Sequence, residues 1–283
     1  MTDLSLPAPL PDDIATTVAR ALAEDVGSGD VTASLIPAAH HCSAEVLCRE
    51  QAVLAGQAWF DAVYASLDPT VAIEWHQTDA QDLSPDSLVC TVRGPARSIV
   101  TGERCALNFL QTLSATATAT RSYVNELAGS GTQILDTRKT IPGLRSAQKY
   151  AVRCGGGANH RLGLFDAVLI KENHIAAAGS IAAAISAIRN THPGLRVEVE
   201  VETMAELEQA LNANTDMVLL DNFAVNEIHA ATQLVAGRAK VEISGGVDFN
   251  QLRQLGQTGA DYISVGALTK HVRAIDFSMR VSV

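Results

Sequence analysis

The sequence predicts a two-part α/β fold, in which a small mixed sheet precedes a parallel β/α barrel. From about Cys42 to Val100, short apolar segments are separated by Gly, Pro and Asp. After Gly131, strand-like and helical segments alternate through about 150 residues, which favours a barrel, complete or incomplete, over an open doubly wound sheet. Aromatic residues make up only 4% of the chain and hydrophobic residues 47%, so Ala, Val, Leu and Ile must supply the core.

The first part opens with helical spacing over residues 12–25 and a turn-rich loop at 26–32. A second helix is predicted over 57–67, and a long helical stretch, continuous or broken near its middle, over 102–129. Short apolar segments read as strands of the mixed sheet at 43–50, 52–56, 71–77, 87–94 and 97–103.

The second part alternates strands with helices. Candidate strands lie at 133–136, 166–172, 197–202, 217–221, 239–244 and 261–266. Helices are predicted between them at 146–156, 180–190, 204–213, 225–237 and 250–259. The Ala-rich stretch 175–188 is too short to span a bilayer and reads as one helix packed on the sheet.

Bulk composition excludes several classes of function. The chain carries 21 Lys and Arg against 31 Asp and Glu, which argues against nucleic acid or an anionic membrane as a general partner. Its five cysteines form no C-x-x-C pair, so we expect reduced thiols, no zinc site and a cytoplasmic protein. The first 13 residues lack the basic start and the apolar run of a signal peptide.

Six cations nevertheless fall between Leu135 and Arg161, beside a single acid, Asp136. A basic cluster in an acidic protein predicts a confined anion site. Arg138 and Lys139 follow a predicted strand directly. Three further cations are spaced four residues apart on the next helix: Arg145, Lys149 and Arg153. That stripe is open to three interpretations, a solvated face, an interface or a neighbour of the site.

Polar residues follow the strands of the second part repeatedly. In parallel β/α architectures the carboxyl ends of the strands share one edge, where sites form. The residues at these ends are Asp136, Arg138 and Lys139; Lys171 and Glu172; Asp221 and Asn222; Ser244, Gly245 and Gly246; and Gly266.

The strand "VEVEVE" alternates Glu198, Glu200 and Glu202 with valines. On a half-exposed strand these glutamates would simply face solvent. In a parallel sheet both faces are covered, so we expect them to face the barrel interior or its mouth. Inward carboxylates need cations, protons or a metal; Lys139 and Lys171 could supply charge, and Mg²⁺ bound to a phosphorylated substrate is the alternative.

Glycines follow the last two strands, in "SGGV" and "SVGA". They can be ordinary turn residues, but their tandem placement predicts a phosphate cradle, since loop glycines let backbone N–H groups approach an anion. In "RCGGGANHR" the glycines follow a helix and read as its cap, which leaves His160 and Arg161 as anion-binding candidates. Together these features indicate an enzyme that handles a phosphorylated sugar and a carboxylate-bearing partner.

Several long segments then resemble the quinolinate phosphoribosyltransferase family, also called nicotinate-nucleotide pyrophosphorylases (carboxylating). The matching segments are 136–175, 197–203, 219–223, 242–246 and 262–269, with "LAEDVGSGDVT" and "ERCALNFLQTLS" in the first half. The resemblance implies that the chain converts quinolinate and phosphoribosyl pyrophosphate into nicotinate mononucleotide, pyrophosphate and CO₂ in NAD biosynthesis, with Mg²⁺ and no organic cofactor.

The resemblance also implies an architecture. An N-terminal α/β sandwich domain is expected at 1–112, an incomplete α/β barrel at 113–270, and a C-terminal tail at 271–283 that returns to the first domain. Such enzymes are homodimers or larger assemblies, in which the sandwich domain of one subunit covers the barrel mouth of the other.

The resemblance also implies a role for individual residues at the positions that match the family's motifs. Quinolinate would contact Arg138, His160, Arg161 and Lys171, joined by Arg104 from the partner subunit. Lys139 would lie between the substrates, and Glu200 and Asp221 would hold the ribose hydroxyls or the Mg²⁺–pyrophosphate. The 5′-phosphate would be cradled by Ser244, Gly245, Gly246 and Gly266.

Three alternatives remain open on the sequence. A related phosphoribosyltransferase could act on another aromatic acid, such as nicotinate, without releasing CO₂. A barrel aldolase could use Lys171 as a Schiff-base nucleophile. A scaffold protein could keep the fold without activity, although it would have no reason to retain so many charged strand-end residues.

Overall fold

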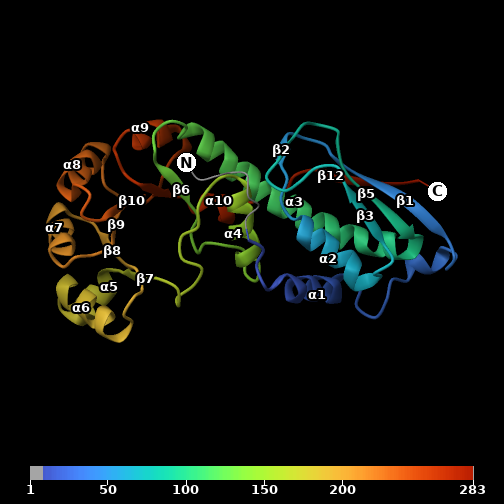
Figure 1. The fold of residues 1–283 in the computed structure, drawn as a ribbon, viewed down its shortest axis with the longest axis horizontal. Helices are drawn as coiled ribbons and strands as arrows, with labels where there is room; N and C mark the ends of the chain where they lie inside the picture. Colours follow the sequence, from blue (N-terminus) through green and yellow to red (C-terminus); the bar gives the residue numbers. More distant parts are fainter. Residues whose placement is uncertain (1–8, 283) are drawn as a thin grey trace. The chain divides into compact units, whose positions relative to one another are not determined.

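The computed structural model describes residues 9–282, and its contacts divide the chain into two compact units (Figure 1). Unit 1 comprises residues 1–121, 140–156 and 267–283, and unit 2 comprises 122–139 and 157–266. Compared with the expected segments, the stretches 113–121, 140–156 and 267–270 are grouped with the N-terminal unit. Residues 1–8, on which the signal-peptide expectation partly rests, lie outside the described residues.

Unit 1 is built on a four-stranded antiparallel sheet in the order β12-β1-β5-β3. Its strands are β1 (His41–Cys48), β3 (Ala72–Trp75), β5 (Ser87–Pro95) and β12 (Phe277–Ser282). A second, two-stranded sheet pairs β2 (Ala52–Val53) with β4 (Asp82–Leu83). Because β12 pairs with β1, the end of the described chain returns to the first sheet.

The helices of this part are α1 (Ile14–Asp25), η1 (Thr32–Leu35), α2 (Gln57–Leu67), α3 (Ala96–Glu126), α4 (Arg145–Cys154) and α10 (Ala267–Lys270). Trp59 and Phe60 of α2 and Leu110 of α3 are fully buried in one core cluster with Val46 and Val92 of the sheet. The aliphatic core expected from composition therefore has a small aromatic centre.

The segment 97–103, predicted as a strand, instead forms the first turns of α3. Ile99 and Gly102 are buried there, and a side chain at Gly102 would meet the Tyr64 ring at 2.6 Å, so this turn packs tightly on α2. The helix then runs unbroken for 31 residues. Within it, Thr118 and Thr120 donate their hydroxyls to the carbonyls four residues earlier, at 2.6 and 2.8 Å, so these polar groups are satisfied inside the helix.

Unit 2 holds a six-stranded parallel sheet in the order β6-β11-β10-β9-β8-β7. The strands are β6 (Gln133–Leu135), β7 (Val168–Ile170), β8 (Val197–Val201), β9 (Met217–Asp221), β10 (Lys240–Ser244) and β11 (Tyr262–Ser264). The first strand pairs with the last, as in a barrel, but β6 and β7 do not pair. The expectation of an incomplete barrel is thereby confirmed.

The helices that follow these strands are α5 (Glu172–Ala178), α6 (Ile181–Thr191), α7 (Met204–Asn212), α8 (Val225–Val235), η2 (Phe249–Gln251) and α9 (Leu252–Gly256). The single helix expected over 175–188 is wrong. Gly179, at φ +87°, ends α5, and the Ser180 hydroxyl caps α6 by accepting from the Ala183 N–H at 3.1 Å.

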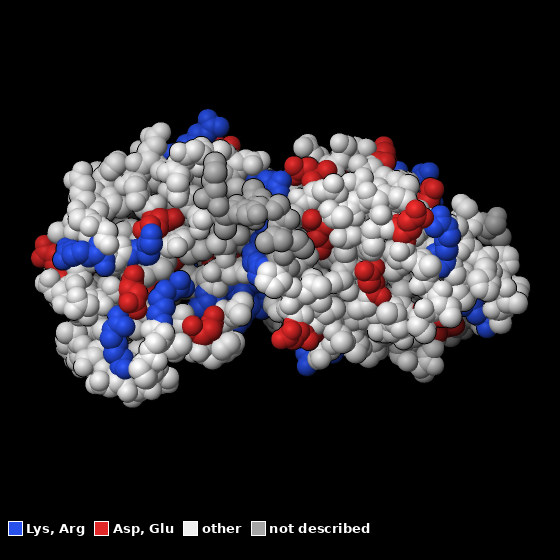
Figure 2. Space-filling model, in the orientation of Figure 1, with Lys and Arg blue, Asp and Glu red and all other residues white. Residues whose placement is uncertain are grey.

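Within the described range, no helix is long and apolar enough to cross a membrane. All five cysteines are free thiols, and all except Cys42 are buried. On the face shown in Figure 2, acidic and basic side chains are interspersed and form no broad basic surface.

Candidate active site

The strand ends of unit 2 share one edge, because all six strands are parallel. Lys171 directly follows Ile170 of β7, which pairs with Val199, so Lys171 lies beside Glu200 of β8. On the next strands, Asp221 at the end of β9 pairs with Ser244 at the end of β10. The register therefore brings four of the predicted site residues from four strands to the same edge.

Lys171 and Glu200 form the closest ionic contact of this edge, between Nζ and Oε2. The Lys171 side chain is 45% exposed and that of Glu200 only 14%, so the carboxylate sits at the mouth of the sheet and the ammonium above it. The sequence predicted that cations, protons or a metal would stabilise the inward glutamates. Glu200 is stabilised by a cation, the ammonium of Lys171.

The three alternating glutamates differ sharply in burial. Glu198 is 2% exposed, Glu200 is half-buried, and Glu202 lies beyond the strand and is exposed. The face of β8 therefore runs from the interior of unit 2 to solvent within five residues. The prediction that these side chains face inward is confirmed for Glu198 and Glu200 and wrong for Glu202, which follows the last paired residue.

Two guanidinium groups lie near each other at the β6 side of the edge. The pKa of Arg161 is lowered, first by burial and then by the neighbouring charge of Arg138, with Glu198 and Asp166 acting in the opposite direction. The Arg138 Nε atom is buried and makes no hydrogen bond within the chain. Two neighbouring cations with donor capacity left over favour a bound anion.

The loop before Arg161 is held by buried Asp136, which follows β6. Its Oδ1 accepts the backbone N–H of His160 at 2.9 Å, and its Oδ2 accepts the side-chain amide of Asn159 at 2.6 Å. Leu135 and Ala158 form a parallel bridge next to these bonds. The acid counted among six cations is therefore an anchor for the loop that carries Arg161.

The glycine loops at the ends of β10 and β11 are tightly fitted. Gly245 has φ +89°, and a Cβ there would lie 2.2 Å from Oδ1 of Asn222, while Gly246 at φ +49° faces open space. A Cβ on Gly266 would lie 3.0 Å from Cδ of Lys139, so Lys139 reaches the second loop. Backbone N–H groups at such loops can meet a phosphate closely.

The helices after these loops are short. η2 has 3 residues, α9 has 5 and α10 has 4. A helix dipole of this length contributes little, so the predicted phosphate cradle would depend on backbone N–H groups and on Lys139.

Other basic residues of the sequence analysis belong to unit 1. Arg104 is exposed on α3, and its predicted contact with a partner subunit's site stays a prediction. In the helical stripe, Lys149 is 1% exposed, so it is not part of a solvated face. Arg145 donates from Nε to the Thr140 hydroxyl at 3.2 Å.

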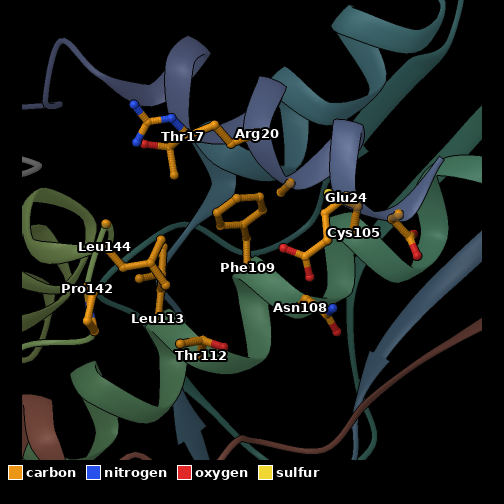
Figure 3. Close-up of a pocket in the computed structure, with 13 residues that line it drawn as sticks. Thr17, Arg20, Glu24, Cys105, Asn108, Phe109, Thr112, Leu113, Pro142 and Leu144 are labelled. Atoms are coloured by element: carbon orange, nitrogen blue, oxygen red, sulfur yellow. The ribbon is translucent and has the colours of Figure 1, made fainter. Parts of the chain in front are cut away.

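A cavity of about 500 Å³ in unit 1 lies between α1, α3 and residues 142–144 (Figure 3). Phe109 and Leu113 of α3 and Arg20 and Glu24 of α1 point into it. None of the strand-end residues lines it.

Comparison with known protein families shows to which family the chain belongs. Residues 30–114 match the quinolinate phosphoribosyl transferase N-terminal domain, and residues 116–280 match the C-terminal domain of the same family. The chain belongs to the quinolinate phosphoribosyltransferase family. These two domains together span most of the sequence.

Individual relatives agree with this assignment. The chain is 40% identical over 260 residues to a probable nicotinate-nucleotide pyrophosphorylase (carboxylating) of Bacillus subtilis, which covers 92% of this chain and 90% of that protein. It is 38% identical to a decarboxylating quinolinate phosphoribosyltransferase of Nicotiana glauca, covering 95% and 82%. The structure of the nicotinate-nucleotide pyrophosphorylase from Francisella tularensis superposes with a TM-score of 0.94 at 46% identity, covering 97% and 98%.

Sequence reasoning missed several residues that shape the site of this quinolinate phosphoribosyltransferase family member. Asp136 was named as a strand-end residue beside the cations, but its role as the anchor of the loop that carries Arg161 was not predicted. Asn222 was named only by its position, yet it limits the space at Gly245. Glu242 was not singled out, although it alternates with apolar residues between Lys240 and Ser244 on β10.

Proposed function

We propose that this chain converts quinolinate and phosphoribosyl pyrophosphate into nicotinate mononucleotide, pyrophosphate and CO₂, a step of NAD biosynthesis. The observation that carries the proposal is the neighbouring pair of guanidinium groups of Arg138 and Arg161 at the strand-end edge. Two adjacent cations suit a diacid, because each carboxylate can accept bidentate hydrogen bonds from an Arg. The names of the relatives support the same chemistry.

In this proposal a cationic set holds the diacid so that its ring nitrogen faces ribose C1. The set comprises Arg104 of the partner subunit with Arg138, Arg161 and Lys171 of the same chain, and His160 lies next to Arg161 as its support. Fixing the nucleophile in this way can lower the barrier by up to roughly 7–11 kcal/mol in favourable cases. The unused Arg138 Nε and the exposed part of Lys171 support this role.

Phosphoribosyl pyrophosphate lies on the glycine loops. Ser244, Gly245, Gly246 and Gly266 would cradle its 5′-phosphate. Lys139, which reaches Gly266, would lie between the two substrates. Glu200 and Asp221 would accept the ribose hydroxyls, and their position at neighbouring strand ends supports this assignment.

The carboxylates of Glu200 and Asp221 are hard oxygen donors, so this edge fits Mg²⁺, which favours one or two carboxylates together with phosphate oxygens. Mg²⁺ bound there would neutralise charge on the pyrophosphate leaving group. Asp221 already accepts a hydrogen bond from Asn222 at 2.9 Å, which orients its carboxylate.

The proposed reaction has two steps, a displacement at ribose C1 and a decarboxylation. The lone pair of the pyridine nitrogen forms a bond to ribose C1 while the bond from C1 to the pyrophosphate oxygen breaks. The pyridinium then accepts the electron pair of the ring-to-carboxyl bond as CO₂ leaves, and the ring carbon takes a proton. Nearby carboxylates stabilise positive charge on the sugar in the first step. No Schiff base is needed, and the contact of Lys171 with Glu200 supports an ionic role for that lysine.

The deciding experiment is mass-spectrometric detection of nicotinate mononucleotide from quinolinate, phosphoribosyl pyrophosphate and Mg²⁺, with CO₂ measured in parallel. Equimolar nucleotide and CO₂ are expected. If the protein turned over nicotinate and not quinolinate, without CO₂ release, a phosphoribosyltransferase specific for another aromatic acid would be favoured. Borohydride trapping of a carbonyl substrate on Lys171 would favour an aldolase.

A homodimer or larger assembly is part of the same proposal, with Arg104 of the partner subunit completing each site. Mixing two inactive variants, Arg104→Ala and Glu200→Ala, tests it after subunit exchange. A mixed dimer would contain one site with both residues intact, so activity should return to about a quarter of the wild-type level if exchange is random. Lack of recovery in a mixture shown to have exchanged would contradict the shared site.

A further inference from the structure

Two buried carboxylates lie behind the site. Glu198 on β8 is 2% exposed and Glu242 on β10 is 1% exposed. His160, at 8% exposure, reaches both, since its Nε2 lies 2.9 Å from Oε2 of Glu198 and 3.4 Å from Oε2 of Glu242. Oε1 of Glu198 and both oxygens of Glu242 are buried without a hydrogen bond of ordinary geometry. Two such groups cannot both stay ionised at low cost.

The hydrogen bonds of His160 fix its tautomer. Its Nδ1 accepts the backbone N–H of Arg161 at 2.7 Å and must therefore carry a lone pair. The ring hydrogen is then on Nε2, which donates to Oε2 of Glu198. The same tautomer argues against a metal ion held by these three residues, because a metal would need the Nε2 lone pair.

The charge of the cluster follows from its surroundings. Burial raises the pKa of Glu242 well above 4.5, and the Glu198 carboxylate raises it further, while Ser264 and Arg196 act in the opposite direction. His160 is neutral because its Nδ1 accepts a hydrogen bond, and the raised pKa of Glu242 favours a carboxylic acid beside Glu198. Glu198 also raises the pKa of Arg161, so its charge stabilises that cation.

From these contacts, and on the basis of the proposed function, we infer that Glu198 and Glu242 are positioning residues that act through His160. Both ring nitrogens of His160 are engaged inside the chain, so His160 orients Arg161 and does not itself bind the quinolinate carboxylate. Asp136 fixes the backbone of His160 at the other side, at 2.9 Å. The backbone N–H of Arg161 is therefore bound to the imidazole of His160, and that imidazole is bound to the buried carboxylate of Glu198.

The first test reads the tautomer directly. ¹⁵N-detected NMR of the wild-type protein, with His160→Gln used for assignment, should show a neutral Nε2–H imidazole, and quinolinate addition should leave that state unchanged. A charged ring, an Nδ1–H tautomer or a proton transfer on adding quinolinate would overturn the inference. The free-protein spectrum needs no turnover, so failure of the proposed function would be seen separately, as lack of nucleotide product.

The second test separates positioning from stability by kinetics. Glu198→Ala should raise KM for quinolinate at least about tenfold, while KM for phosphoribosyl pyrophosphate changes less than about twofold. Glu242→Ala should act in the same direction, and Glu242→Gln should recover most of the loss, because an amide is neutral and has nearly the shape of the protonated carboxyl group. Glu208→Gln, the same change at an exposed position of α7, is the matched control.

The kinetic outcomes are decisive in both directions. An equal rise of both KM values in folded Glu198→Ala would show general damage to the site and contradict the inference. A Glu242→Gln variant as impaired as Glu242→Ala would show that a charged Glu242 is needed. If Glu198→Ala does not fold, the tautomer of the wild-type ring still decides the question.

Discussion

The ammonium of Lys171 contacts the carboxylate of Glu200 across the neighbouring ends of β7 and β8. In the proposed reaction these residues serve different substrates, Lys171 the diacid and Glu200 the sugar. Without substrates, Lys171 and Glu200 neutralise each other's charge. In the proposed reaction, the diacid then binds Lys171 and the sugar binds Glu200 in place of this ion pair. Removal of the carboxylate should therefore leave the diacid site usable and disable the sugar site.

Glu200→Ala should keep the dissociation constant for quinolinate within about threefold and lower kcat at least about 100-fold, since a group that stabilises charge in the transition state is lost. Calorimetry and steady-state kinetics measure the two effects. Glu208→Gln on α7 controls for loss of an exposed carboxylate. Near-normal turnover would contradict the role of Glu200.

Arg138→Ala should weaken quinolinate binding by at least about tenfold and leave phosphoribosyl pyrophosphate binding within about twofold, because the guanidinium with a free Nε is lost. Isothermal titration with each substrate checks this. Arg253→Ala removes an Arg that is 78% exposed and paired with Glu126, and it should change neither affinity. Unchanged quinolinate affinity in Arg138→Ala would remove the main support for the proposed function.

Much of the fold follows from local sequence. The strands of unit 2 are short segments in which apolar residues run together or alternate with polar ones, so all six strands could be placed. The start of α3 could not, since Ile99 and Val100 suit a strand equally well, and the close packing of Gly102 on Tyr64 involves a residue far away in the sequence. The break at Gly179 did carry a signal, a glycine followed by a serine, which the surrounding alanines concealed.

Some residues of the candidate site could be predicted from the sequence, and others could not. Residues directly after strands, such as Lys171 and Asp221, could be predicted because parallel strands end at one edge. The partnership of Glu198 with Glu242 could not, since β9 separates their strands in the sheet and 44 positions separate them in the sequence. The function of His160 depends on which atoms its nitrogens meet, which no spacing in the sequence records.

Gly245→Ala should raise KM for phosphoribosyl pyrophosphate at least about tenfold. The new Cβ would lie 2.2 Å from Oδ1 of Asn222, and the φ of +89° is unfavourable for alanine, so the loop must move. Gly246→Ala is the matched comparison, because it introduces the same methyl group where no atom lies within 4 Å, and its effect should be smaller. Equal effects would show that backbone conformation, and not the fit against Asn222, governs this loop.

Glu242→Gln should change how stability depends on pH. The folded protein keeps a proton on Glu242 above pH 4.5, where the unfolded chain releases it, because burial raises the pKa of this group. The Glu242 contribution is therefore full below its unfolded pKa and declines as pH rises, by up to about 1.4 kcal/mol per pH unit for one proton, until the folded group ionises. Glutamine does not titrate, so the free energy of unfolding of Glu242→Gln relative to wild type should increase with pH. Urea unfolding from acidic to neutral pH measures the difference, and Glu208→Gln should give a nearly flat one. A flat difference for Glu242→Gln would show that the buried pair does not hold an extra proton.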